Sequence, residues 1–377
     1  MIVSRPYADL TVDGGAGFPA TLGKGSMHRL IMTSTILEHE ISELRLLVER
    51  QTGIVLDSPN SVLAARVADF IETQGLDSST TLLDHLRSSE QDPSSLPSLL
   101  DGLINTNTGF FRHPGAMNAF MRQVLPQLCA RKSADTPGPI RIWSAGCGTG
   151  EETYSIAMSV CDAVNPANVG NPVNGNGTGK TGPRSGGIAE SLQSTLPQPA
   201  RLNAGCSIHI VGSDLLRNNV EIADRGVYPQ SALDGLPPAT IRNYFSKIGS
   251  PAVAAPNGAQ SDLESDSLTS QSSTSAAHLL VKPRLRSLVT FNCMNLARPG
   301  YIGRFDCIFC MDVLPHFSRV QRIAVLERLH LYLEPGGYLF LSQTEKLSAP
   351  NLNFRSETFD GYSFHRKPLA ASAAYGR

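Results

Sequence analysis

Residues 141–152 read Arg141-Ile142-Trp143-Ser144-Ala145-Gly146-Cys147-Gly148-Thr149-Gly150-Glu151-Glu152. It begins as a short apolar strand, passes through a turn with three alternating glycines, and ends in the acidic start of a helix. Glycine has no Cβ, so the backbone at such a turn can approach a ligand that other residues would exclude. This order of strand, glycine turn and helix indicates a ligand site at the end of a strand.

The acidic residues directly after the glycines restrict the chemistry of that ligand. The carboxylates of Glu151 and Glu152 would repel a phosphate group. The loop also fits neither the phosphate-binding pattern Gly-x4-Gly-Lys-Ser/Thr nor the dinucleotide pattern Gly-x-Gly-x-x-Gly. A cationic ligand fits better, and S-adenosylmethionine carries a positively charged sulfonium. Taken alone, the Gly-x-Gly-x-Gly run is equally compatible with a turn that binds nothing.

Composition excludes several classes of protein. The chain has 377 residues, of which 41% are hydrophobic and 17% charged, as is typical of soluble globular proteins. Its net charge of -1 gives no basic excess, so we expect no nucleic-acid partner. No apolar run approaches the ~20 residues of a membrane span, so we expect no direct membrane insertion. We expect a monomer.

The cysteines favour a reducing compartment, and we expect a cytoplasmic protein. There are seven of them, an odd number without the spacing of a disulfide framework. Cys307 and Cys310 have Cys-x-x-Cys spacing, but they lie in a strand-like apolar run, where positions i and i+3 face opposite sides of the pleat. We therefore predict two buried strand cysteines and no metal site.

The first part of the chain predicts a small all-α domain with a linker at residues 34–128, after a disordered N-terminus at 1–33. The first helix has one apolar face and ends at Gly53. Three further segments repeat apolar residues at helical spacing. They begin near Leu63, Leu82 and Leu96.

From Ile140 the pattern changes to alternating strands and helices. We predict strands at 140–144, 207–212, 289–292, 305–310 and 337–342, helices at 152–164 and 321–332, and a turn at Pro335-Gly336-Gly337. This alternation predicts an α/β domain of Rossmann-like type over residues 129–368, with a mostly parallel sheet and helices on both faces. Two low-complexity stretches, at about 165–203 and 250–277, are too polar to bury a core and are interpreted as surface insertions.

Asp214 follows the predicted second strand. In dinucleotide-type sites, an acidic residue at that strand end bonds the ribose hydroxyls. The usual separation from the glycine loop is restored when the 165–203 insertion is removed. An alternative, compatible role is capping of a helix that begins near Leu215.

The run Asn105-Thr106-Asn107-Thr108-Gly109-Phe110-Phe111-Arg112 is also unusual. It is interpreted either as core packing beside a surface charge, or as a polar cluster that presents hydroxyls and a guanidinium to the cofactor. In the second interpretation, Phe110 and Phe111 anchor the cluster to the core.

Several of these motifs occur together in one known family. Over residues 40–364 the chain resembles the chemotaxis receptor glutamate O-methyltransferases of the CheR type. The resemblance is carried by residues 48–57, 108–112, 143–152, 225–228, 243–245, 289–291 and 295–296. It implies an all-α domain followed by an S-adenosylmethionine-dependent methyltransferase domain with a small inserted β-subdomain between Tyr244 and Leu288. It also implies S-adenosylmethionine as cofactor, and the cytoplasmic helical region of a chemoreceptor as protein substrate.

The resemblance assigns roles residue by residue. Thr108 and Arg112 would line the methionine end of the cofactor, with Arg112 also near the transferring methyl. Glu151 would lie by the cofactor's amino group, Asp214 on the ribose, and Asn295-Leu296 along the adenine. The full set of expected cofactor-binding residues is Thr106, Thr108, Arg112, Gly146, Gly148, Glu151, Asp214, Asn295, Leu296, Met311 and Asp312. The expected catalytic residues are Arg112, from the resemblance, and His316, which departs from it.

The chain departs from the family at three places. Thr106 stands where the family commonly has Asn. Where the family has Arg-Asn-Val-x-Ile-Tyr-Phe, this chain reads Met311-Asp312-Val313-Leu314-Pro315-His316-Phe317. Where the family has His-Ser-Glu-Asn, it reads Gln343-Thr344-Glu345-Lys346.

These departures leave three interpretations of the acceptor. A glutamate is already ionised at neutral pH and needs no general base, and Arg112 would hold its carboxylate in line. Asp312 would repel such a carboxylate, and His316 would serve as a general base for a hydroxyl or amine acceptor. The chain is therefore a glutamate methyltransferase, a methyltransferase with another acceptor, or a donor-binding module without catalysis.

Overall fold

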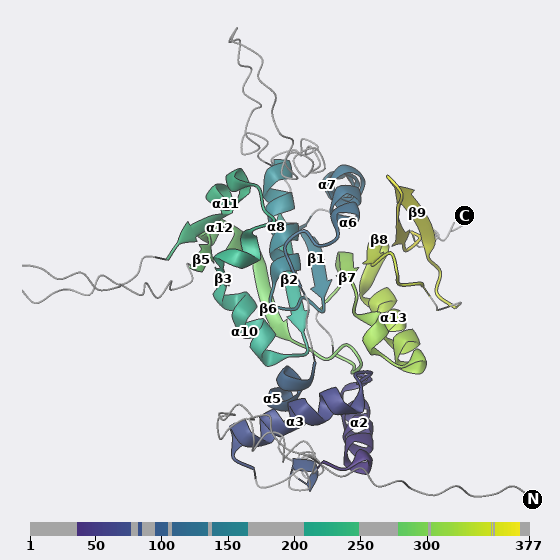
Figure 1. The fold of residues 1–377 in the computed structure, drawn as a ribbon. Coiled ribbons are helices and arrows are strands. Elements are labelled where there is room, and N and C mark those ends of the chain that lie inside the picture. Colours follow the sequence, from purple (N-terminus) through teal and green to yellow (C-terminus); the bar gives the residue numbers. More distant parts are fainter. Residues whose placement is uncertain are drawn as a thin grey trace, which may run out of the picture.

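The computed structural model describes residues 36–76, 82–84, 95–104, 108–134, 138–164, 207–248, 278–300, 303–347, 349 and 351–369. They form a group of N-terminal helices, a large sheet flanked by helices, and a small separate sheet (Figure 1). The predicted disordered N-terminus and both predicted insertions lie outside the described residues. Among the helices described, none has the length and apolar character needed to cross a membrane.

The N-terminal helices share a core of their own. They are α2 (Glu38–Thr52), α3 (Asn60–Gln74) and α5 (Ser95–Leu103). Helix α2 ends as predicted at Gly53, whose φ of 78° is left-handed and whose N–H donates to the carbonyl of Glu49. Of the helix predicted near Leu82, only residues 82–84 are described, and they are helical.

These helices lie against the carboxyl ends of the parallel strands, below the large sheet in Figure 1. Leu216, from the loop after a central strand, is buried in the same core as the N-terminal helices. The Arg298 guanidinium donates to the carbonyl of Gln51, and a Cβ at Gly53 would lie 2.5 Å from that of Ala297. The helical region therefore covers the loops that follow the parallel strands.

The linker to the sheet is one helical run. It consists of α6 (Pro114–Ala119), the π-helical turn η1 (Phe120–Val124) and α7 (Leu125–Ala134). Phe120 is fully buried and packs edge-on against Phe309 of the sheet.

The large sheet has seven strands in the order β6-β2-β1-β7-β8-β10-β9. Neighbouring strands from β6 to β8 pair in parallel, and β10 pairs antiparallel with β8 and β9. The order reverses between β1 and β7, which makes the topological switch point of a Rossmann-like fold. The strands are β1 (Ile140–Ala145), β2 (Ile208–Asp214), β6 (Val289–Cys293), β7 (Phe305–Cys310), β8 (Leu333–Leu341), β9 (Arg355–Phe359) and β10 (Tyr362–Arg366).

Alternate residues of the central strands feed two separate cores, one on each face of the sheet. Ile142 and Phe309 lie in the core covered by α7 and α8 (Glu151–Val164), whereas Trp143 and Ile308 lie in the core covered by α13 (Arg319–Tyr332). The predicted α/β class with helices on both faces is thereby confirmed.

Cys307 and Cys310 are both fully buried and lie in opposite cores, so the prediction of two buried strand cysteines is confirmed. The predicted turn at Pro335-Gly336-Gly337 is wrong, because these residues lie within β8. The pairing of β7 with β8 shifts register between Phe305 and Cys307, and Gly336 has a φ of 75°. The glycines therefore lie at an irregularity of the β7–β8 ladder, where residues 334–337 stand opposite Asp306 alone.

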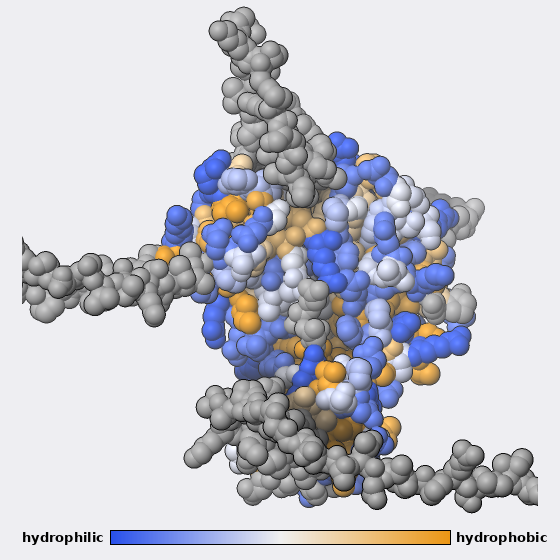
Figure 2. Space-filling view, in the orientation of Figure 1, coloured by the Kyte–Doolittle hydropathy of each residue, from blue (hydrophilic) through white to orange (hydrophobic). Residues whose placement is uncertain are grey.

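The predicted inserted β-subdomain is present as a three-stranded antiparallel sheet in the order β3-β5-β4. Its predicted bounds, Tyr244 to Leu288, are too narrow, because β3 precedes Tyr244 in the chain. Its strands are β3 (Val227–Pro229), β4 (Phe245–Lys247) and β5 (His278–Val281). The short helices η3 (Gln230–Leu233) and α11 (Pro238–Tyr244) contact it, whereas α10 (Arg217–Arg225) and α12 (Pro283–Arg286) contact β6 of the large sheet. The face of the molecule seen in Figure 2 is mostly hydrophilic, with hydrophobic residues in small scattered groups.

Candidate functional site

A cavity of about 340 Å³ opens at the carboxyl ends of the parallel strands. Open α/β sheets bind ligands at this edge, where the strand order reverses. The segments that follow β1, β2, β6 and β7 form its wall. It is closed by the segment at 108–113, directly before α6, and by Ile54 of the helical region. The lining residues used below are Thr108, Arg112, His113, Gly146, Gly148, Glu152, Asp214, Asn295, Leu296, Met311, Asp312, Val313, His316 and Phe317.

The glycine loop is held by the protein itself. The N–H groups of Gly146 and Cys147 donate to the carbonyl of Ser213 at 2.8 and 2.9 Å. The N–H of Gly148 donates to Oδ2 of Asp214 at 2.9 Å. Three consecutive amide groups are thus used within the fold, so this loop does not offer the amide cradle with which phosphate loops hold an anion. The geometry agrees with the sequence argument against phosphate.

Packing explains why Gly146 is a glycine. Its φ is 82°, and a Cβ there would lie 2.3 Å from Cγ2 of Val313. We expect Gly146→Ala to lower the free energy of unfolding by roughly 2–4 kcal/mol, from left-handed strain and overpacking together. Urea denaturation of both proteins measures this difference.

Gly75→Ala is the matched control. Gly75 has a similar φ of 65°, but no described heavy atom lies within 4 Å of a Cβ placed there. This variant should lose only about 1–2 kcal/mol, from backbone strain alone. Equal losses in the two variants would show that the contact with Val313 carries no weight.

Asp214 ends β2 and is 9% exposed on the cavity wall. Its carboxylate accepts from Gly148 and, through Oδ1, from the N–H of Leu216 at 2.9 Å and from Nδ2 of Asn219 at 3.1 Å. Burial raises the pKa of Asp214, and these hydrogen bonds oppose the rise. The alternative prediction, that Asp214 caps the next helix, is wrong, because the N-cap of α10 (Arg217–Arg225) is Leu216 and no side chain caps that helix. The carboxylate instead holds the loop between β2 and α10.

The two adjacent glutamates at the start of α8 differ in position. Glu151 is buried and is not among the cavity-lining residues, and its carboxylate accepts from the Thr149 hydroxyl at 2.9 and 2.7 Å. Glu152 lines the cavity and accepts from the Ser144 hydroxyl at 2.7 Å. Burial, followed by the charges of Asp312 and other carboxylates, raises the pKa of Glu152 to about 7.

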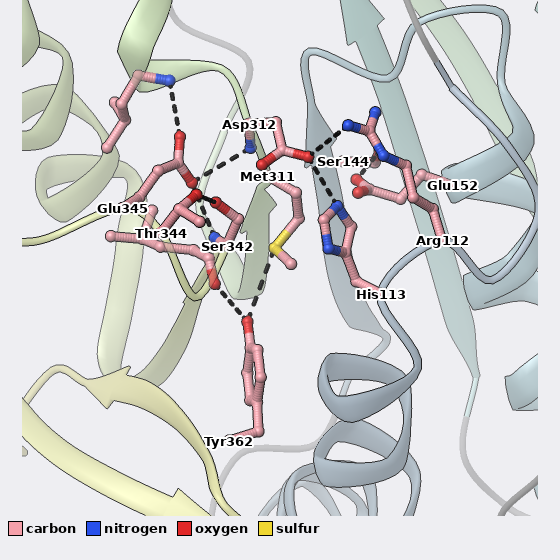
Figure 3. A network of polar contacts seen from close by, with 12 residues as sticks. Arg112, His113, Ser144, Glu152, Met311, Asp312, Ser342, Thr344, Glu345 and Tyr362 are labelled. Carbon is pink, nitrogen blue, oxygen red and sulfur yellow. Dashed lines mark hydrogen bonds and ion pairs between the residues drawn. The ribbon is translucent and has the colours of Figure 1, made fainter. Parts of the chain in front are cut away.

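Arg112, His113 and Asp312 meet on the cavity wall (Figure 3). Oδ2 of Asp312 lies 3.0 Å from Nη2 of Arg112 and 3.0 Å from Nε2 of His113. Asp312 has a φ of 58°, a left-handed conformation that Asn and Asp tolerate better than most residues. Arg112 thus holds a carboxylate, and that carboxylate belongs to the same chain.

Glu345 fixes the loop that carries Asp312. Its Oε2 accepts from the N–H of Asp312 at 3.2 Å and of Ser342 at 2.8 Å, and its Oε1 accepts from the N–H of Leu314 at 3.0 Å. This glutamate therefore joins the loop after β7 to the loop after β8 (Figure 3).

The remaining predicted residues are placed as follows. Thr108 lies against Gly148, 3.3 Å from where a Cβ would be, and Met311 is buried on the wall. Asn295 and Leu296 follow β6 on the wall. His316 is exposed on the wall, and its carbonyl accepts from the N–H of Val55 of the helical region at 2.8 Å. Thr106 lies outside the described residues.

Three residues that line the cavity were not predicted from the sequence: Glu152, His113 and Ile54. The motif offered two neighbouring glutamates, and only the register of α8 shows that Glu152 faces the cavity. His113 is adjacent to a predicted site residue, a signal that could have been used. Ile54 reaches the cavity through its antiparallel bridge to Phe317, a contact between distant parts of the chain.

Comparisons with known proteins identify the family of the chain. The family model described as CheR methyltransferase, SAM binding domain, matches residues 106–172 and 182–362. The chain is 28% identical over 307 residues to chemotaxis protein methyltransferase 1 of Pseudomonas aeruginosa, covering 81% of this chain and 89% of that protein. It is 27% identical over 317 residues to a chemotaxis protein methyltransferase of Vibrio parahaemolyticus, covering 83% and 91%. The chain belongs to the CheR methyltransferase family, and its cofactor is S-adenosylmethionine.

Proposed function

We propose that this protein transfers methyl groups from S-adenosylmethionine to glutamate side chains of a chemoreceptor-like protein, giving methyl esters. The observation that carries the proposal is the position of Arg112. Its guanidinium lies on the wall of the cofactor cavity and pairs there with a carboxylate, that of Asp312. The cavity wall therefore has a cation suited to a carboxylate acceptor. The names of the relatives, which are chemotaxis protein methyltransferases, support the receptor as the source of that acceptor.

The cavity residues fit the cofactor. A volume of about 340 Å³ lies within the usual range for small-molecule sites. We assign the ribose hydroxyls to Asp214 and the adenine to the segment of Asn295 and Leu296. We assign the cofactor's amino group to Glu152 in preference to Glu151, because Glu152 faces the cavity and Glu151 is bonded to Thr149.

The chain's own residues then orient the acceptor and restrict the access of water. When bound, S-adenosylmethionine supplies a methyl group on cationic sulfur, and its transfer to a carboxylate oxygen leaves S-adenosylhomocysteine and a methyl ester without moving a proton. Arg112 orients the acceptor carboxylate, and orientation of this kind contributes several kcal/mol to catalysis. Ile54 and Phe317 restrict the access of water to the cavity from the side of the helical region.

A second candidate acceptor is a neutral hydroxyl or amine. The negative charge of Asp312 beside Arg112 favours this candidate, because that charge opposes a second carboxylate. His316, exposed on the cavity wall, would then accept the proton that such an acceptor must lose.

The assignment of Glu152 predicts a pH dependence of binding. Burial raises the pKa of Glu152 to about 7, so the carboxyl is largely neutral below pH 7 and ionised above it. Only the ionised form attracts an ammonium group, so affinity for S-adenosylhomocysteine should increase as the pH rises from 6 to 8. Calorimetric titration at several pH values measures this.

Glu152→Gln is the control for that titration. The ligand's own ionisation affects both proteins equally, so the difference between their profiles isolates Glu152. The affinity of the variant for S-adenosylhomocysteine should not increase near pH 7. Parallel profiles for the two proteins would remove Glu152 from the amino-group site.

Chemical stability of the product tests the proposed function. The protein is incubated with methyl-labelled S-adenosylmethionine and a cytoplasmic chemoreceptor fragment, or with the same fragment whose methylation-site glutamates are changed to alanine. We expect label in the first fragment only, released as methanol by mild alkali because esters are base-labile. Label that resists alkali, or that is equal in both fragments, would contradict glutamate methylation and favour the second candidate.

A further inference from the structure

We propose that Asp312 selects acceptor glutamates that have a basic side chain nearby, by an exchange of ion-pair partners on the cavity wall. The inference rests on the proposed function and goes beyond it, because it names a feature of the substrate. In the exchange, the acceptor carboxylate takes the place of Asp312 on Arg112. The acceptor's own cation pairs with the displaced Asp312.

The ion pair is accessible to a substrate. The side chains of Arg112 and Asp312 are 42% and 30% exposed, and that of His113 is 22% exposed. Because the pair is partly solvated, water compensates much of the attraction that is lost when it opens. An incoming protein segment can therefore reach and separate the two groups.

The backbone of Asp312 stays fixed when its side chain exchanges Arg112 for a cation of the acceptor. Glu345 holds the N–H groups of Asp312 and Leu314, so the loop keeps its position when the ion pair opens. The carboxylate of Asp312, which Figure 3 shows beside Arg112 and His113, then remains on the cavity wall.

Charge explains why the acceptor needs a cation. A bare glutamate that binds Arg112 would bring a second carboxylate next to Asp312, and like charges at such short distance repel. Glu152, on the same wall, adds to the negative field once it is ionised. An acceptor with its own lysine or arginine takes the place of Arg112 on Asp312, beside His113, so Arg112 and Asp312 each keep a partner of opposite charge.

The test compares two forms of the same receptor fragment. In one, a lysine lies one helical turn from the target glutamate, at i+4 or i-4, and in the other that lysine is glutamine. These positions lie on the same helix face as the glutamate. We expect the enzyme to methylate the lysine form with roughly tenfold higher kcat/KM, an effect that high salt should reduce.

Asp312→Asn tests whether Asp312 carries this preference. Asparagine tolerates the left-handed backbone and has nearly the same shape, but it lacks the charge. We expect the variant to lose the preference for lysine and to methylate the glutamine form faster than the parent does. Asp360→Asn is the matched control, because Asp360 is an aspartate that also has a positive φ, of 48°, and it is exposed and does not line the cavity. It should keep the preference of the parent.

Two results would overturn the inference, and they are distinguishable. If both fragments are methylated equally well by the parent, or if Asp312→Asn keeps the preference, the inference fails and the proposed function stands. If neither fragment is methylated although S-adenosylhomocysteine binds, the proposed function fails and the inference with it.

Discussion

Asp214→Ala is expected to lower the affinity for S-adenosylhomocysteine at least about 100-fold. The carboxylate lies on the cavity wall, and two charge-assisted hydrogen bonds to ribose hydroxyls would contribute about 3–6 kcal/mol. The substitution also removes the acceptor for the N–H of Gly148 in the glycine loop. Calorimetric titration of the ligand into parent and variant measures the loss.

Asn219→Ala separates the loss of the ligand from the loss of fold. Asn219 donates to the same carboxylate at 3.1 Å, is buried, and does not line the cavity. Its removal should cost about 1–3 kcal/mol of stability while leaving affinity within a few-fold of the parent. A folded Asp214→Ala protein that binds S-adenosylhomocysteine as tightly as the parent would remove Asp214 from the cofactor site.

Glu345→Ala is expected to lower kcat/KM about 100-fold, although Glu345 does not line the cavity. Its carboxylate holds three backbone N–H groups, two of them in the loop that carries Asp312. Without it, this loop shifts against Arg112, and a displacement of about 1 Å at a reacting site can cost this much. Initial rates with the receptor fragment measure the effect.

Two further variants identify Glu345 as a positioning residue. Glu345→Gln keeps one amide oxygen as acceptor and should lie between the parent and the alanine variant. Gln343→Ala changes an exposed residue of the same turn and should leave the rate unchanged. If Glu345→Ala lost only thermal stability, with the rate preserved below its melting temperature, the residue would be structural alone.

The sequence predicted the central parallel strands because most of their residues are apolar and buried. β7 has every residue buried, and its predicted bounds match those observed. β9 and β10 were not predicted, because charged residues such as Arg355, Glu357 and Arg366 interrupt their apolar pattern. Their ladder lies at the sheet edge, where one face is exposed and the pattern weakens.

The candidate site was only partly predictable for a different reason. The glycine loop and Asp214 are local signals at strand ends, and both line the observed cavity. The contact of Asp312 with Arg112 joins residues 200 positions apart, and its geometry depends on the left-handed backbone of Asp312. Likewise, the choice between Glu151 and Glu152 depends on helix register, which neighbouring identical residues cannot reveal.

In the proposed function, donor and acceptor meet in the cavity at the carboxyl ends of the parallel strands. A crystal structure with bound S-adenosylhomocysteine would locate the donor. We predict the ligand in this cavity, with the ribose hydroxyls on Asp214, the amino group on Glu152, and the sulfur facing Arg112 and Asp312. A ligand bound elsewhere, or one whose sulfur faces away from Arg112, would contradict the account.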